Sequence, residues 1–215
     1  RRPRSRFTGA LEPMTRAGVA YYERELRDLV RINYVEPQRS PLAVAERSPA
    51  DESALGHVEY FAELIDEWAP EAHTDERLYR LGSSVIEALA AGVPVEPLAR
   101  YFEFWLLRLQ GVYPALSACP ECGSVFDGGA VMPPREHQFL CRRCAPAAGG
   151  TMVSIGAMKF LRAAAAAAPD ALHAVPLEAG AARELETAHS RLINMHLEKE
   201  LKSARVLRAL GRSHG

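Results

Sequence analysis

The sequence predicts an α+β protein that is mainly α: a helical bundle with an inserted four-cysteine zinc ribbon, preceded by a short β segment. Three observations indicate this class. All four cysteines lie between Cys119 and Cys144, the flanking segments carry apolar residues at helical spacing, and strand-like runs are confined to the residues before Val35. The chain has 215 residues, 48% of them hydrophobic and 25% charged, as in ordinary globular proteins with a buried core.

The β segment lies between Phe7 and Val35. Three runs, FTGALEPM, AGVAYY and LVRINYV, carry β-branched and aromatic residues and predict strands joined by a hairpin. The stretch 36–53 is rich in proline and serine and predicts a boundary. The expected organisation is a β segment at residues 1–38, a linker at 39–53 and a helical domain at 54–215, with the zinc ribbon inserted at 117–150.

Helices are expected at residues 54–69, 76–92, 95–111, 155–168 and about 183–210. Thr74 and Asp75 are candidate caps of the second helix, which ends at Gly92, and Ser154 is the candidate cap of the fourth. The third is apolar over most of its circumference, which predicts a central buried helix. The last is predicted to be one long amphipathic helix with two opposed sets of residues: Arg191, Lys202, Arg205 and Arg212 in one arc, and Leu192, Ile193, His196, Leu207 and Leu210 in the other.

The cysteines form two Cys-x-x-Cys pairs, Cys119 with Cys122 and Cys141 with Cys144. Each pair presents two thiolates from one tight turn, and four thiolates complete a tetrahedron around zinc. Gly123 is expected in a left-handed conformation, and Asp127-Gly128-Gly129 is expected to reverse a hairpin. No signal peptide is visible, so disulfides or redox use are the weaker alternatives. Because four protein ligands close the coordination shell, the predicted cofactor is one structural Zn²⁺.

A catalytic zinc pattern is the competing interpretation of part of this sequence. His57-Val58-Glu59 followed by a Cys-x-x-Cys occurs in zinc deaminases. Here Ala118 stands where that signature has proline, the gap from His57 is long, and a second cysteine pair is left over. His57 is therefore expected on a helix surface. P-loop, GxSxG and dinucleotide motifs are missing from the sequence, and no catalytic residues are expected.

The net charge is −1, but the charges are segregated along the chain. Residues 51–76 hold nine acidic residues and no lysine or arginine, whereas residues 189–212 hold six basic residues and two acidic ones. Overall neutrality therefore does not exclude a polyanion partner. The sequence contains no stretch of about 18 uncharged apolar residues, so no membrane partner is expected.

The basic features each have a functional and an ordinary interpretation. The arginines before Phe7 could bind phosphates, or they could form a solvated chain end. The basic arc of the last helix could bind DNA or simply face solvent. Arg142 and Arg143 lie inside the second cysteine pair, where they could bind phosphate or stabilise the thiolates by charge.

Several segments carry a family resemblance. YFEFWLLRLQGVYPALSACPECG, residues 101–123, closely resembles the segment of the bacterial RecO recombination mediator family that leads into its first cysteine pair. RRPRSRFTGALEPMT resembles that family's basic strand near the end of an N-terminal OB-fold, LKSARVL its final helix, and AELIDEW and PEAHTDERLYRL its first helices. The resemblance implies that residues 1–38 are the C-terminal part of an OB-fold in an N-terminally truncated chain.

The resemblance also implies a function. The expected protein is a bacterial DNA-repair protein without enzymatic activity, located in the cytoplasm at the nucleoid. It is expected to bind single- and double-stranded DNA, anneal complementary strands and, with RecR, help load RecA onto DNA coated by the single-stranded-DNA-binding protein, whose acidic C-terminal tail is a further partner. The resemblance assigns zinc ligation to the four cysteines and DNA contact to a basic set: Arg1, Arg2, Arg4, Arg6, Lys159, Arg162, Arg191, Lys202 and Arg205.

Two other classes of protein stay open at this point. The first is a zinc-ribbon scaffold that binds only protein, using its acidic helix and its basic helix for different partners. The second, more distant, is a metal-dependent enzyme.

Overall fold

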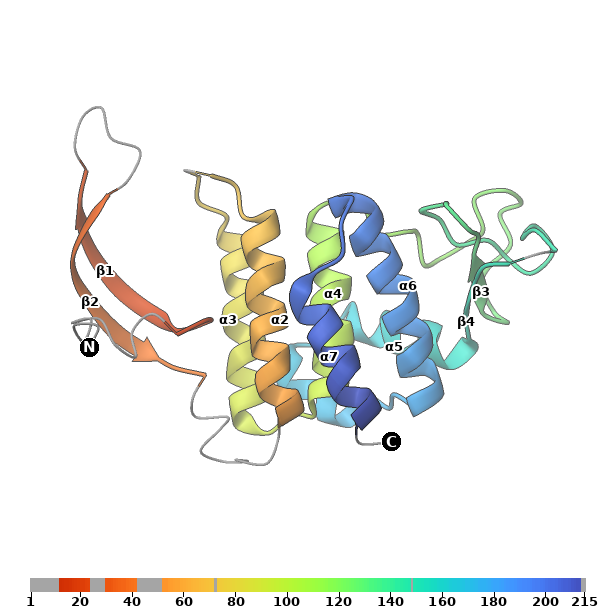
Figure 1. Cartoon of the computed structure of the whole chain (residues 1–215). Coiled ribbons are helices and arrows are strands. Elements are labelled where there is room, and N and C mark those ends of the chain that lie inside the picture. The colour runs from red at the N-terminus through yellow and green to blue at the C-terminus, as the bar shows by residue number, and fades with distance from the viewer. Residues whose placement is uncertain (1–11, 24–29, 42–51, 72, 148, 214–215) are drawn as a thin grey trace.

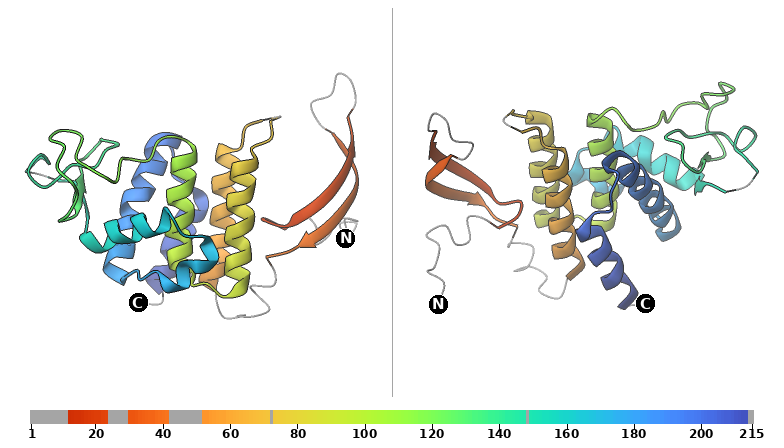
Figure 2. Two further views of the ribbon diagram at one scale, coloured as in Figure 1. Left: turned by 180° about the vertical axis from the view of Figure 1, so that it is seen from behind. Right: turned by 45° about the horizontal axis from the view of Figure 1, so that its top comes forward.

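The computed structural model describes residues 12–23, 30–41, 52–71, 73–147 and 149–213. The elements follow in the order β1 (Arg16–Tyr22), β2 (Arg31–Arg39), α2 (Glu52–Trp68), α3 (Glu76–Ala91), α4 (Val95–Leu109), β3 (Ala130–Met132), β4 (Thr151–Val153), α5 (Ile155–Ala164), the 3₁₀ helix η1 (Pro169–Ala174), α6 (Ala179–Leu197) and α7 (Lys202–Ser213). Figures 1 and 2 show the β1–β2 and β3–β4 antiparallel sheets at opposite ends of a helical bundle. The protein is therefore mainly helical, as predicted.

Local capping signals set several helix ends. The Asp75 carboxylate accepts a hydrogen bond from the Leu78 amide at 2.9 Å and caps α3, and Ser154 accepts one from the Ala157 amide and caps α5. Gly92 ends α3 in a left-handed conformation with φ 101°, which costs glycine nothing because it lacks a Cβ. These three predictions are confirmed.

α5 is shorter than its alanine run predicts, because α4 competes for its carbonyl groups. The Trp105 indole donates to the Ala164 carbonyl at 3.1 Å, and the Tyr101 hydroxyl donates to the Ala167 carbonyl at 3.3 Å. These bonds satisfy carbonyls that another helical turn would use. Pro169 also disfavours a helical conformation at Ala168, whose backbone is extended.

The prediction of one long C-terminal helix is wrong. α6 ends at Leu197, where Glu198 adopts a left-handed conformation with φ 55°, and α7 begins at Lys202. The start of α7 is fixed from elsewhere in the fold, because the Glu63 carboxylate on α2 accepts the Lys202 amide at 3.0 Å and the Ser203 amide at 2.8 Å. Arg191 therefore lies on α6, on a different helix from Lys202, and the single basic arc does not form.

Close packing holds α7 against α2. A Cβ on Gly56 of α2 would lie 2.7 Å from Leu207 Cδ2, so a side chain there would require the Leu207 side chain to move. At the turn before α7, the Lys199 ammonium lies 2.6 Å from the Glu67 carboxylate. The acidic and basic segments of the sequence thus partly neutralise each other inside the molecule.

The N-terminal strands differ from the prediction in one respect. β1 and β2 confirm the second and third apolar runs and pair antiparallel, with Val19 opposite Val35. The described end of the first run, Glu12 to Met14, forms a bend and turn rather than a strand. The rest of that run lies outside the described residues, as do four predicted DNA contacts: Arg1, Arg2, Arg4 and Arg6.

α4 is the central buried helix, as predicted. It contacts α2, α3, α5, α6 and η1, and its Phe102 ring lies against Phe61 of α2, with centroids 4.6 Å apart and planes tilted by 41°. Its buried face also carries two charged residues, Arg100 and Glu103, which are 3% and 1% exposed. Burying charges is costly unless they are paired, so their partners matter for the fold.

Glu103 sits at the centre of a buried polar network. Its Oε1 accepts hydrogen bonds from the Arg100 guanidinium at 2.9 Å and the Tyr60 hydroxyl at 2.8 Å, while Oε2 contacts His189 Nδ1 at 2.9 Å. A carboxylate can only accept, so Nδ1 carries the proton, and in neutral His189 the Nε2 atom accepts from the Tyr113 hydroxyl at 2.8 Å. The network therefore ties α2, α4 and α6 together.

The expectation that His57 lies on a helix surface is wrong. The side chain is 7% exposed, its Nδ1 bonds the Ser53 carbonyl at 2.7 Å, and its ring packs edge-on against Tyr60. The sequence pattern of α2 suggested that His57 lies on the acidic face of the helix. In the structure the His57 side chain faces the core, near the buried Arg100 and Glu103 of α4.

The two buried histidines predict that acid destabilises the helical domain. Burial lowers the pKa of His57 and of His189 from the ordinary value of 6.5. The unfolded chain therefore takes up protons as the pH falls through 6.5, whereas the folded chain does so only at lower pH. We expect the free energy of unfolding to decrease from pH 7.5 to pH 5.5, by at most about 1.4 kcal/mol per pH unit for each histidine. Urea denaturation across this range measures the slope. A slope that His189→Gln leaves unchanged would contradict the assignment to His189.

Candidate functional site

The four cysteines come together in one cluster. Their sulfur atoms all lie within 4.8 Å of one another, and the Sγ atoms of Cys122 and Cys141 are 3.7 Å apart. Zinc–sulfur bonds of about 2.3 Å in a tetrahedron place the sulfurs about 3.8 Å apart, so the cluster has the dimensions of a four-thiolate metal site. The cysteines are not disulfide-bonded. The predicted ligand set is thus one that could bind a metal ion.

Tight turns bring the two thiol pairs together. The Gly123 amide donates to the Cys119 carbonyl at 2.8 Å, and the Ala145 amide donates to the Cys141 carbonyl at 2.9 Å. Gly123 has φ 71°, which confirms its predicted left-handed conformation. Each turn therefore points two sulfurs at the same point from a short stretch of backbone.

The strand pairing around the cluster differs from the predicted hairpin. Asp127 and Gly128 form a bend that leads from the bridge between Ala118 and Val125 into β3. β3 then pairs with β4, which follows the expected end of the ribbon at residue 150. A Cβ on Gly129 would lie 2.6 Å from the Val153 carbonyl oxygen, so a side chain there would separate the two strands.

Unneutralised thiolates at this distance repel one another. The pKa of Cys144 is raised to about 12 by hydrogen bonds with Cys122 and Cys141. The pKa of Cys122 is lowered to about 6 by hydrogen bonds from Ser124. One sulfur thus keeps a proton while its neighbour gives one up. A divalent cation at the centre would let all four ionise, which is the chemistry of a four-cysteine metal site.

Arg143 adds positive charge beside the sulfurs. Its guanidinium donates to the Ser124 hydroxyl oxygen at 2.7 Å, and that hydroxyl lies 3.3 Å from Cys122 Sγ. Four thiolates around a divalent cation leave a net negative charge, which this guanidinium offsets. The sequence left two interpretations of Arg143 open, phosphate binding and stabilisation of the thiolates by charge. The geometry supports stabilisation of the thiolates.

The charge beside the sulfurs can be tested by comparing two adjacent arginines. Arg143→Gln is expected to lose bound metal about tenfold faster to a chelator than the unmodified chain, because outer residues of metal sites typically contribute 10–100-fold in affinity. Arg142→Gln is the matched control, since Arg142 is exposed and no hydrogen bond or ion pair joins it to the described part of the chain. Stopped-flow release to a coloured chelator measures both rates. Equal rates in the two variants would contradict the role of Arg143.

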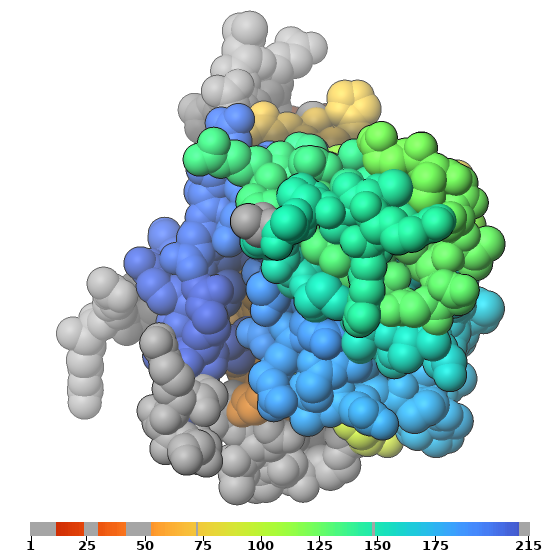
Figure 3. Space-filling view, turned by 90° about the vertical axis from the view of Figure 1, so that its right-hand side faces the viewer, coloured from red at the N-terminus to blue at the C-terminus, as the bar shows by residue number. Residues whose placement is uncertain are grey.

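Two predicted DNA contacts hold residues 117–150, the cysteine segment, against the bundle. The Arg162 guanidinium on α5 donates to the Leu116 and Phe126 carbonyls, at 3.3 and 2.9 Å. The Arg191 guanidinium on α6 donates to the carbonyls of Met132 and Pro133. Figure 3 shows the segment, in green, packed over α6, in blue. Both arginines thus have a structural role that the sequence did not indicate.

The remaining basic residues of the predicted set are exposed on separate helices. Lys159 lies on α5, and Lys202 and Arg205 lie on α7. The structure therefore does not gather the described members of the set into one surface. Among the described residues, no helix combines the length and apolar character needed to cross a membrane.

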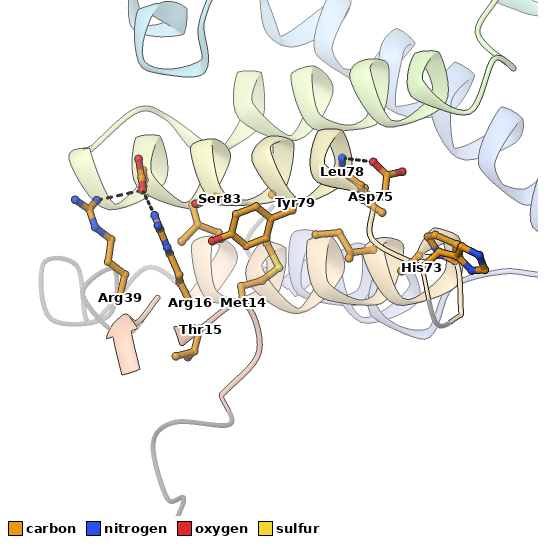
Figure 4. Close-up of a pocket in the computed structure, with 15 residues that line it drawn as sticks. Met14, Thr15, Arg16, Arg39, His73, Asp75, Leu78, Tyr79 and Ser83 are labelled. Atoms are coloured by element: carbon orange, nitrogen blue, oxygen red, sulfur yellow. Dashed lines mark hydrogen bonds and ion pairs between the residues drawn. The ribbon is translucent and has the colours of Figure 1, made fainter. Parts of the chain in front are cut away.

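An apolar pocket of about 280 Å³, which the sequence did not indicate, lies between β1, α2 and α3 (Figure 4). Met14 lines it from the turn before β1, and a Cβ on Gly82 would lie 2.8 Å from Ile65 Cδ1 and 3.3 Å from Met14 Cε. At one end, the guanidiniums of Arg16 and Arg39 lie 3.9 and 3.5 Å from the Glu87 carboxylate. These contacts attach the β1–β2 sheet to the helices.

The comparisons with known proteins define the class and then the family. Residues 49–205, which include the helices and the four-cysteine cluster, match the family model described as "Recombination protein O C terminal", so the class is that of recombination proteins. The chain belongs to the RecO family.

Individual relatives agree with this family. The DNA repair protein RecO of Koribacter versatilis is 36% identical over 141 residues, which are 66% of this chain and 56% of that protein. The DNA repair protein RecO of Anaeromyxobacter sp. strain K is 32% identical over 219 residues, covering 98% of this chain and 82% of the relative. That of Symbiobacterium thermophilum is 30% identical over 218 residues, covering 98% and 83%. The chain thus matches a little over half of the first relative and most of the other two.

Proposed function

We propose that this protein is a DNA repair and recombination mediator that binds single- and double-stranded DNA and anneals complementary strands. The observation that carries the proposal is the family match over residues 49–205, together with relatives named as DNA repair proteins. Its partners would be RecR, in the loading of RecA, and the acidic tail of the single-stranded-DNA-binding protein. No catalytic step is proposed.

The proposal gives each part of the molecule a role. The cysteines hold one Zn²⁺, which when bound cross-links the two turns of the segment. The segment is then a zinc ribbon, and β1 and β2 are the last strands of an OB-fold whose cationic edge follows the DNA backbone. The proposed DNA contacts are Arg1, Arg2, Arg4 and Arg6, with Lys159, Lys202 and Arg205 as further contacts. The packing of α7 on α2 disfavours the alternative in which the acidic and basic helices bind separate proteins.

Strand annealing tests the function directly. We expect this chain to accelerate the annealing of complementary oligonucleotides coated with the single-stranded-DNA-binding protein, without ATP, and more strongly at low salt than at high salt. Salt-independent annealing, or none, would overturn the proposal and leave a protein-binding scaffold as the better account.

Neutralising the N-terminal arginines is expected to reduce the salt dependence of DNA binding. Each phosphate contact contributes about 0.7 to the slope of log K against log[salt] for single strands. Replacing Arg1, Arg2, Arg4 and Arg6 with glutamine is therefore expected to lower the slope by up to about 3 and to weaken binding for all sequences. Fluorescence anisotropy at several salt concentrations measures it. An unchanged slope would place the DNA contacts elsewhere on the protein.

A further inference from the structure

The break between α6 and α7 creates a polar groove that the sequence did not predict. Its volume is about 610 Å³, and Figure 3 shows the hollow between α7, in the darkest blue, and the lighter α6. α6 contributes most of the lining, and α7 contributes Arg208. Met195 is the one apolar side chain among the lining residues. A groove with this composition suits a charged, hydrated ligand rather than an apolar one.

The α6 wall carries hydrogen-bond donors in a regular row. Arg183, Ser190 and Asn194 line the groove on one face of the helix and can donate to a ligand, whereas the hydroxyl of Thr187, which lies between them, donates to the Arg183 carbonyl at 2.8 Å. With a rise of about 1.5 Å per residue, the row extends about 16 Å along the helix axis. Guanidinium, hydroxyl and amide groups along such a row can donate to successive oxygens of an extended polymer.

The lining of the groove carries more arginines than acids. Three arginines line it, Arg183, Arg191 and Arg208, against one acid, Glu186. Glu200 pairs with Arg208, but both side chains are substantially exposed, and exposed ion pairs are weak enough to exchange for a phosphate. The acceptors of Arg191 in the cysteine segment are neutral carbonyls, so they fix its guanidinium without cancelling its charge. Glu136 is a further acid near Arg191.

We propose that the α6–α7 groove binds the phosphodiester backbone of a single DNA strand, through Arg183 and Arg208 and the donors of α6. The inference rests on the proposed function and adds a location for one strand. Among the described residues, none that lines the groove is aromatic. The contact is therefore to phosphates rather than to stacked bases, and it does not depend on the DNA sequence. An acidic peptide with apolar side chains is the less suitable ligand, because the groove offers such side chains only Met195.

The test compares two double variants with the same change in charge. Arg183→Gln with Arg208→Gln removes two groove cations and leaves the bonds of Arg191 to the cysteine segment intact. Arg77→Gln with Arg80→Gln removes two exposed cations from α3 and serves as the control. The groove variant is expected to reduce the salt slope for a single-stranded oligonucleotide by about 0.7 for each phosphate that is no longer neutralised, whereas the control keeps its slope. Thermal unfolding of both variants checks that each is folded.

A second variant separates hydrogen bonding from charge. Ser190→Ala with Asn194→Ala is expected to weaken binding several-fold without changing the salt slope, since the number of released counterions stays the same. If the unmodified chain binds no DNA, the proposed function itself fails. If it binds DNA and the groove and control variants have equal slopes, the groove is not the site. If the groove variant loses only the capture of a synthetic acidic C-terminal peptide, the ligand is a peptide and the inference is wrong.

Discussion

A Cys119→Ser variant is expected to lose the proposed Zn²⁺ and, with it, the folded structure of residues 117–150. Cys119 is 1% exposed and is the most buried of the four cysteines. A serine hydroxyl in its place would be a poor metal ligand, and water could not readily reach the site to take over that position. Structural zinc contributes on the order of 10 kcal/mol to the folding of small zinc-finger peptides. The strand β3 of the segment is three residues long and pairs with β4, an equally short strand just after the segment, and strands so short do not hold together alone.

The loss is expected to spread into the bundle along specific contacts. Phe126 and Phe139 are fully buried and belong to the same continuous core as the helices. When the segment unfolds, the guanidiniums of Arg162 and Arg191 also lose their carbonyl acceptors. α5 and α6 should therefore lose stability before α3, whose main contacts are with α4, η1 and α2.

Hydrogen exchange and metal analysis measure this outcome. The variant is expected to bind less than one metal ion per chain, to unfold at a lower temperature and to exchange faster in the segment, α5 and α6 than in α3. Val125→Thr is the matched control, because Val125 lies in the same segment but is 64% exposed. A metal-free variant that unfolds at the temperature of the control would show that the metal is dispensable for the fold.

The features that the sequence predicts well are local ones. Cap residues such as Asp75 and Ser154 act within three positions of the helix they start, so their effect can be recognised without knowing the fold. Cys-x-x-Cys spacing likewise fixes the geometry of each thiol pair before the two pairs meet. The central position of α4 follows from its apolar circumference, which only a buried helix can satisfy.

The features that the sequence does not predict depend on distant partners. The start of α7 is capped by Glu63, which is 140 positions away from Ser203, and nothing local marks Glu198 as the end of α6. The resemblance assigns Arg162 and Arg191 to DNA contact, and it does not reveal the carbonyls that approach their guanidiniums from another segment. The groove between α6 and α7 exists only because the helix is broken, so no property of a continuous helix could indicate it.

Removing the carboxylate of Glu103 is expected to destabilise the helical domain by about 3–5 kcal/mol, the usual cost of breaking a buried ion pair. Glu103→Gln would leave the Arg100 guanidinium buried without its hydrogen-bonded counter-charge. Among the described residues, Nε and Nη1 of Arg100 already lack a hydrogen-bond partner, so Glu103 supplies most of its compensation. Burial opposes the ionisation of Glu103, but Arg100 and the hydrogen bond from His189 outweigh it, so the pKa of Glu103 lies below the ordinary value.

Urea denaturation with matched variants identifies the cause of this loss. Glu96→Gln, on the exposed first turn of the same helix, is the control and is expected to cost less than about 1 kcal/mol. Replacing both partners, Arg100→Met with Glu103→Leu, is expected to recover much of the stability, because no unpaired charge is then left in the core. A double variant no more stable than Glu103→Gln would mean that the hydrogen bonds of Glu103 to Tyr60 and His189, rather than its charge, position α4 between α2 and α6.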